Sequence, residues 1–78
     1  MDRGLLEQRL AAAERNVALG FVVIVEQRQA IAALVAWGQD ATSARRMLQA
    51  FEAMQASFVE DWEFATVQLA ADDMRKAV

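Results

Sequence analysis

Few residues of this sequence have the types and spacing that chemistry requires. Glu60 and Glu63 lie three residues apart, a spacing that places both carboxylates on one face of a helix, with Asp61 beside them. Helical bundles build metal sites from such pairs, but those sites add His and carboxylates from a second helix, and this chain has no His. We therefore interpret the cluster as a solvated acidic face and expect no metal site. A bound cation or a basic partner is the alternative.

A second polar group interrupts an otherwise apolar region. Gln27 and Arg28 lie midway along the first half of the chain, and Gln55 lies in the second half. An inward-facing amide needs a partner, because an unpaired buried polar group costs about 1–3 kcal/mol. The first interpretation is a polar layer that fixes the register of two helices, with Arg28 paired to Glu26 or Glu52. The alternative is a niche for a small ligand between the helices.

Composition excludes several classes of site and of partner. The chain has no Cys and no His, so the usual ligands of zinc, haem and iron–sulfur clusters are missing, and we expect no cofactor. The net charge is −3, and the only adjacent basic pairs are 45–46 and 75–76, so we expect no nucleic-acid partner. The dense Arg and Lys constellation of small helical enzymes is also absent. We predict a non-enzymatic protein.

The elements that position these residues are predicted to be two long helices. A hydrophobic fraction of 56%, no Pro and only three Gly predict an all-α fold in one domain, residues 1–78. Apolar or small residues recur at alternating steps of three and four, the 3.5-residue period of a packed helical seam. The predicted seam positions are Leu6, Leu10, Ala13, Val17, Gly20, Ile24, Gln27, Ile31 and Leu34 in the first half, and Ala44, Leu48, Phe51, Gln55, Phe58, Trp62, Ala65 and Leu69 in the second.

A short turn is predicted to join the two helices. Gly38 suits the left-handed residue that closes a helix, and Asp40 suits the N-cap of the next one. We expect a first helix over about residues 3–37, a turn over 38–40 and a second helix over about 41–75 with a frayed end. So short a turn makes the helices antiparallel. At Gly20 we expect close packing against Trp62 or Phe58, with a kink or a ligand niche as the alternatives.

Large apolar side chains also lie outside the predicted seam. A two-helix hairpin leaves these side chains in water. Each of them forgoes the stabilisation of about 1.5–3 kcal/mol that full burial of a large apolar side chain provides. We therefore expect a homodimer in which two antiparallel hairpins form a four-helix bundle. The predicted oligomer or partner interface consists of Leu19, Phe21, Val22, Val23, Val25, Val35, Trp37, Met47, Met54 and Val59.

The segment Val17–Val25 contributes most of this surface. Burial in a homo-oligomer is the first interpretation, and docking on another protein or contact with a membrane interface are the alternatives. We do not expect membrane contact, because the nine apolar residues are far fewer than the ~20 of a spanning helix and their flanking charges are mixed. The first ten residues lack the pattern of a signal peptide, so a cytoplasmic location is expected.

One further pattern runs through the first half of the chain and the start of the second. It consists of Ala13-Glu14-Arg15, Gly20, Ile24, Gln27-Arg28, Ile31-Ala32, Leu34, Gly38, Asp40, Thr42, Ala44, Leu48 and Phe51-Glu52. This pattern resembles that of a family of short uncharacterised proteins common in alphaproteobacteria. The family pattern bears charged residues, often His, after its central Gly and again near 57–63, where this chain has FVV and SFVEDWEF. The resemblance implies a helical hairpin without an assigned activity.

The predicted function is that of a small interaction or structural module that self-associates through its apolar surface. Two alternatives remain open at the level of sequence. The chain is an accessory subunit that docks on a larger protein assembly, or it is a regulatory module that binds a small ligand beside Gln27, Arg28 and Gln55.

Overall fold

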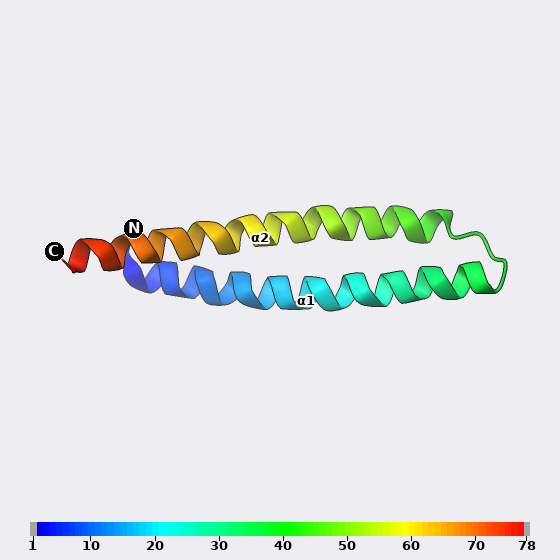
Figure 1. Ribbon diagram of the computed structural model, residues 1–78, viewed down its shortest axis with the longest axis horizontal. Coiled ribbons are helices and arrows are strands. Elements are labelled where there is room, and N and C mark those ends of the chain that lie inside the picture. The colour runs from blue at the N-terminus through cyan, green and yellow to red at the C-terminus, as the bar shows by residue number, and fades with distance from the viewer. Residues whose placement is uncertain (1, 78) are drawn as a thin grey trace.

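The computed structural model, which describes residues 2–77, is an antiparallel hairpin of two helices (Figure 1). Helix α1 spans Arg3–Ala36 and helix α2 spans Thr42–Lys76. These bounds lie within one residue of the predicted ones, while the first and last residues of the predicted domain 1–78 lie outside the described residues. The hairpin is 63 Å long and 16 by 14 Å across. The all-α hairpin is therefore confirmed, and α2 stays helical to Lys76 where fraying was expected.

The turn is built around Gly38. This residue has φ of +68°, the left-handed conformation that Gly adopts without a steric penalty. Its N–H donates to the Val35 carbonyl at 3.0 Å, and the Gln39 N–H donates to the Leu34 carbonyl at 2.8 Å. This pair of bonds is the Schellman motif, which satisfies carbonyls that the end of α1 would leave unpaired.

Both N-termini have a side chain that accepts a backbone bond. Asp2 is the N-cap of α1, and its carboxylate accepts from the Leu5 N–H at 3.3 Å. Asp40 was predicted to be the N-cap of α2, but the N-cap is the next residue, Ala41. The Asp40 carboxylate still accepts from the Thr42 N–H at 3.0 Å and from the Thr42 hydroxyl at 2.6 Å. The acidic residue therefore orders the approach to α2 from outside the helix.

The seam between the helices is thin. Every predicted seam residue is buried or half-buried except Trp62, which is 39% exposed. No large side chain is fully buried within residues 2–77. Across the described part of the chain, six residues are buried, and half of them are alanine: Leu6, Ala13, Ile24, Ala41, Ala65 and Leu69. One helix covers only one side of its neighbour, so the hairpin alone has little core.

Candidate interaction surface

Two glutamines link the helices across the seam. Gln27 on α1 donates through Nε2 to the Ala44 carbonyl of α2 at 3.0 Å. Gln55 on α2 donates through Nε2 to the Val17 carbonyl of α1 at 2.9 Å. Each side chain reaches the backbone of the opposite helix, so sliding α1 along α2 would break both bonds. This geometry is that of the predicted polar layer.

Gly20 lies against Gln55, and not against Trp62 or Phe58 as the sequence suggested. A Cβ at Gly20 would overlap the Gln55 amide oxygen and would lie 2.8 Å from Cδ. The expectation was wrong because it paired Gly20 with the residues of α2 that lie equally many positions from the turn at 38–40. In the structure α2 begins inward of the end of α1 (Figure 1), which brings an earlier residue of α2 opposite Gly20. The amide oxygen of Gln55 is buried without a hydrogen-bond partner among residues 2–77.

Arg28 takes the second of its two predicted partners. Its Nη2 lies 3.7 Å from Oε2 of Glu52 on α2. Both side chains are exposed, and exposed ion pairs contribute only about 0–1 kcal/mol. Arg28 and Gln55 line one open groove of about 380 Å³ together with Glu52, Glu60 and Glu63. Gln27 does not line this groove, so the three residues of the predicted ligand niche do not converge on one site.

The acidic cluster is divided between two sides of α2. Glu60 and Glu63 line the groove beside Arg28, whereas Asp61 lines a separate groove with Arg9. Within the part of the chain that the structure describes, no three acidic side chains gather closely enough to hold a metal ion. The geometry thus separates the carboxylates that a bundle metal site would need to bring together.

The predicted interface residues also fall on different sides of the hairpin. One set surrounds a groove of about 210 Å³ lined by Asn16, Leu19, Gly20, Val23, Phe51, Met54 and Phe58. Trp37 lies two heptads after Val23, and Met47 lies one heptad before Met54, so both continue this side. Trp37 is 82% exposed and Leu19 is 65% exposed. We call this side the apolar face: Leu19, Val23, Trp37, Met47 and Met54, with half-buried Phe51 and Phe58.

The other set lies across the seam. Val59 lines the groove that contains Arg28 and Glu52. Phe21 and Val35 lie one heptad before and after Arg28, and Val25 lies one turn after Phe21, so these side chains share that side. Arg45 belongs there too, because it lines a groove with Arg28 and Glu52. We call this side the charged face: Phe21, Val25, Val35 and Val59 among Arg28, Arg45, Glu52, Glu60 and Glu63.

Val22 belongs to neither set. Helical rotation of about 100° per residue places it between Phe21 and Val23, on the back of α1 away from α2. It is 50% exposed. The ten predicted interface residues therefore cannot all lie in one flat interface, and the largest contiguous apolar group among them is the apolar face.

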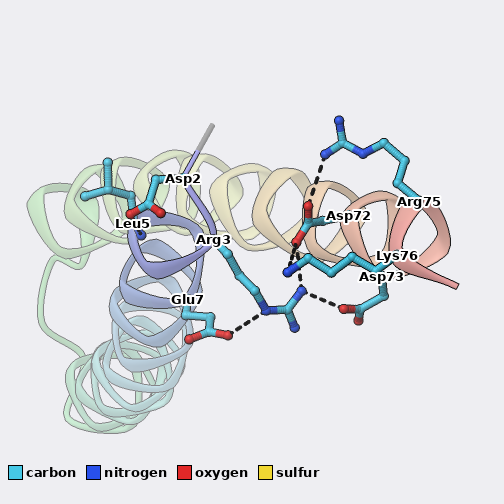
Figure 2. Close-up of polar contacts among 8 residues, drawn as sticks. All are labelled: Asp2, Arg3, Leu5, Glu7, Asp72, Asp73, Arg75 and Lys76. Atoms are coloured by element: carbon cyan, nitrogen blue, oxygen red, sulfur yellow. Dashed lines mark hydrogen bonds and ion pairs between the residues drawn. The ribbon is translucent and has the colours of Figure 1, made fainter.

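An ion-pair cluster that the sequence analysis missed joins the two ends of the chain (Figure 2). Nη1 of Arg3 donates to Asp72 Oδ2 at 2.9 Å and to Asp73 Oδ1 at 2.6 Å, while Nε donates to Glu7 at 3.0 Å. Lys76 also lies 3.4 Å from Asp72. The hydrogen bond from Arg3 lowers the pKa of Asp72 and raises that of Arg3 itself. We call this cluster the terminal clasp: Arg3, Glu7, Asp72, Asp73 and Lys76. The opposite charges near the two ends of the sequence are the signal that could have predicted it.

Helix α1 also meets a composition criterion for a membrane span. An 18-residue stretch within it has a mean hydropathy of 1.6 and at most two charged residues, and only 6% of that stretch is buried. Residues 17–25 alone are too short to span a membrane, whereas this longer stretch of α1 meets the criterion of length and composition. Core helices and signal sequences also pass this test, so one such helix is weak evidence.

Comparison with protein-family models gives no match, and comparisons with curated proteins and with solved structures give none either. The resemblance to the alphaproteobacterial family therefore stays a prediction from sequence.

Proposed function

We propose that this chain is a non-enzymatic interaction module that self-associates through its apolar face to form a four-helix bundle in the cytoplasm. The observation that carries the proposal is the apolar face itself. Five large apolar side chains and a groove that opens between the helices lie on one side of a hairpin that has almost no core. Such a surface favours contact with a matching apolar surface over contact with water.

The energy at stake is large for a chain of this size. Full burial of one large apolar side chain stabilises by about 1.5–3 kcal/mol. The five exposed members of the apolar face retain a third to four fifths of their accessible surface. Covering them would contribute on the order of 5 kcal/mol, which equals the lower end of a whole domain's stability. Association therefore supplies the burial that a second layer of structure supplies in larger domains.

A second copy of the hairpin fits this requirement by area. A standard interface buries about 800 Å² on each partner. That is about one seventh of the 5774 Å² of accessible surface of this chain. One long side of the hairpin is enough to supply it. Pairing two such sides places four helices around one core, the arrangement in which inward side chains of all four become buried.

A membrane surface is the second candidate, favoured by the hydropathy of α1. In that case the stretch with mean hydropathy 1.6 would bind lipid in place of a second copy. Vesicles of neutral and of anionic lipid test this candidate directly. Sedimentation of the chain with vesicles, together with a monomeric mass in their absence, would replace the self-association proposal.

Two neighbouring valines provide a matched test of self-association. Val23 lies on the apolar face and Val22 on the back of α1, and both are accessible, 37% and 50% exposed respectively. We expect the chain to have the mass of a dimer in light scattering at micromolar concentration. Val23→Glu should shift it to a monomer, because a carboxylate would be buried without a partner. Val22→Glu should leave it dimeric. Equal masses for the two variants would contradict the assignment of the interface.

A further inference from the structure

The charges of the charged face are divided along its length. Near the turn the face carries Arg28 and Arg45, which line one groove together with Glu52. Toward the chain ends it carries Glu60 and Glu63, which line the neighbouring groove. Both of these glutamates are exposed, and neither makes an ion pair within the described part of the chain. The face therefore has a positive half near the turn and a negative half near the chain ends.

Helix α1 repeats this division in one column of side chains. Glu14, Phe21 and Arg28 are spaced by seven residues, so they share one side of the helix. All three are exposed, and Phe21 is 64% exposed. At a rise of 1.5 Å per residue, the Phe21 ring lies about 10 Å along the helix from each of the two opposite charges. An aromatic side chain thus marks the midpoint between a negative and a positive group.

Helix α2 has the same midpoint. Gly20 lies against Gln55 and the helices run antiparallel, so the residue that follows Gly20 is level with position 54. Arg45 and Glu63 lie nine residues before and nine residues after that level. The level that divides the opposite charges of α1 equally therefore also divides those of α2.

A two-fold axis that crosses the hairpin at this level joins opposite charges. It stacks α1 on α1 and α2 on α2 of a second copy, with the two turns at opposite ends. Arg28 then lies over Glu14 of the other copy, and Arg45 lies over Glu63 of the other copy. The symmetry makes each of these pairs twice. The two Phe21 rings meet at the axis, where the contact removes their apolar surface from water.

Other two-fold arrangements of this face bring like charges together. With the turns at the same end, α1 lies over α2 of the other copy, so Arg28 faces Arg45 and Glu14 faces Glu63. An axis one heptad closer to the turn stacks the two copies of Arg28 on each other. An axis one heptad closer to the chain ends stacks the two copies of Glu14. Because opposed like charges disfavour a contact, the charge pattern favours one arrangement and one register.

We propose that the charged face is a second self-association surface, on which two hairpins pair with their turns at opposite ends through Arg28 with Glu14 and Arg45 with Glu63. This face and the apolar face lie on opposite sides of the seam, so each contact can form without the other. Where both form, a dimer joined by its apolar faces presents a charged face on each outer side. Such dimers join into longer assemblies, because neither contact closes the other.

Salt separates the charged contact from the apolar one. Charges are screened beyond about 8 Å at about 0.15 M salt but only beyond about 30 Å at about 0.01 M, so the charged contact forms at low ionic strength. Apolar burial does not depend on attraction between charges. The net charge of −3 on each chain acts in the opposite direction, since chains of like net charge repel more strongly at low salt. Association that increases at low salt therefore requires a complementary pattern of charge.

Light scattering over a series of NaCl concentrations measures this dependence. The unchanged chain should have the mass of a dimer at about 0.5 M salt and at least about twice that mass at about 0.01 M. A mass that does not rise as salt is removed overturns the charged contact and leaves the apolar dimer standing. A monomer at high salt that associates at low salt supports the charged contact and overturns the apolar dimer.

Charge reversal tests the pairing of Arg45 with Glu63. Arg45→Glu and Glu63→Arg each place like charges in contact, so each variant alone should lose the increase in mass at low salt. An equal mixture of the two variants should recover it, because both of their mutual contacts join opposite charges. Arg15→Glu, on the back of α1, changes the net charge as Arg45→Glu does and should keep the increase. Equal behaviour of Arg15→Glu and Arg45→Glu would overturn the pairing.

Disulfide formation tests the register. The chain has no Cys, and Phe21→Cys places a single thiol at the two-fold axis, so mild oxidation at low salt should join two chains. Val35→Cys lies on the same face at a similar exposure, 53% against 64%. It is two heptads from the axis, about 42 Å along the helix from its counterpart, so it should form far less disulfide. Cross-linking of Val35→Cys as fast as that of Phe21→Cys overturns the register.

Discussion

The two long sides of this hairpin share one seam and differ in what they present. On the charged face, Arg28 reaches Glu52 across the helices, and Val59 lines the same groove as Glu60 and Glu63. On the apolar face, Val23 and Met54 line a groove whose lining residues are all uncharged. The seam holds α1 to α2 whichever side faces water. The positions that flank the seam therefore decide which side is available to a partner.

This difference changes the meaning of the apolar run at residues 17–25. As a string it is uniformly apolar, but the helix distributes it among the seam, both faces and the back of α1. Phe21 is as exposed as Leu19, 64% against 65%. By heptad position Phe21 shares its side of the hairpin with Arg28, whereas Leu19 lines one groove with Val23 and Met54. Exposure alone does not identify an interface, whereas exposure among other apolar side chains does.

The largest expected effect comes from a substitution in the seam that pushes the two helices apart and so disrupts both faces. Gly20→Leu would place a side chain where the Gln55 amide now lies, and overpacking of this kind costs about 1–3 kcal/mol. The midpoint of urea denaturation at fixed chain concentration should fall accordingly. Gln55→Ala in the Gly20→Leu background should recover part of the loss. Greater stability of Gly20→Leu than of the unchanged chain would show that the two helices do not approach closely here.

A second prediction affects one face and spares the other. Leu19→Arg should weaken dimerisation at least tenfold, equivalent to about 1.4 kcal/mol, because the guanidinium would enter an apolar interface. Phe21→Arg starts from equal exposure but adds a cation to the charged face, which already carries Arg28 and Glu52, so the dimer dissociation constant should stay within about threefold. Analytical ultracentrifugation over a concentration series measures both. The reverse ranking would assign the interface to the charged face.

A third prediction concerns the weight of the charged face. Arg28 and Glu52 are exposed and 3.7 Å apart, so a double-mutant cycle with Arg28→Ala and Glu52→Ala should give a coupling of about 0.5 kcal/mol or less. Thermal or urea unfolding of the four variants provides the cycle. A coupling above about 1.5 kcal/mol would mean that this side is desolvated, as it would be if a partner covered it.

The smallest expected effect comes from two carboxylates at opposite ends of the hairpin, Asp72 in the terminal clasp and Asp40 in the turn. The hydrogen bond from Arg3 lowers the pKa of Asp72, and that from the Thr42 hydroxyl lowers the pKa of Asp40. Groups with a lowered folded pKa stabilise above their ordinary value, about 3.9 for Asp, and this contribution is lost as the pH falls further. Unfolding midpoints measured from pH 5 to pH 2 should therefore decline. Arg3→Gln should reduce the decline, while Arg15→Gln, on a solvated part of α1, should not.

The sequence was sufficient for the hairpin because helix periodicity is local. Alternating steps of three and four marked the seam, and Gly38 marked the turn. The position of Gln55 against Gly20 was not predictable in the same way, because register depends on the path of residues 38–41. A small error in the assumed centre of the turn moves every opposing pair along α2.

The separation of the exposed apolar residues into two faces was not predicted, for a related reason. The predicted interface gathered residues outside the seam without asking on which side of it they lay, so Phe21 and Leu19 were placed together. Their heptad positions were readable from the sequence, and combining them with the antiparallel register would have separated the two faces. The terminal clasp was missed because Arg3 and Asp72 lie at opposite ends of the chain, where only the folded hairpin makes them neighbours.

The Gly38 turn also has a consequence for the order in which the hairpin assembles. Contacts beside the turn close loops of a few residues, whereas the Arg3 contact with Asp72 closes a loop of about seventy, and the entropy lost on closure grows with loop length. The helices should therefore zip together from Gly38 outward, with the terminal clasp closing last. The same gradient operates in reverse, so amide hydrogens near the clasp should exchange with solvent sooner than those beside the two glutamines.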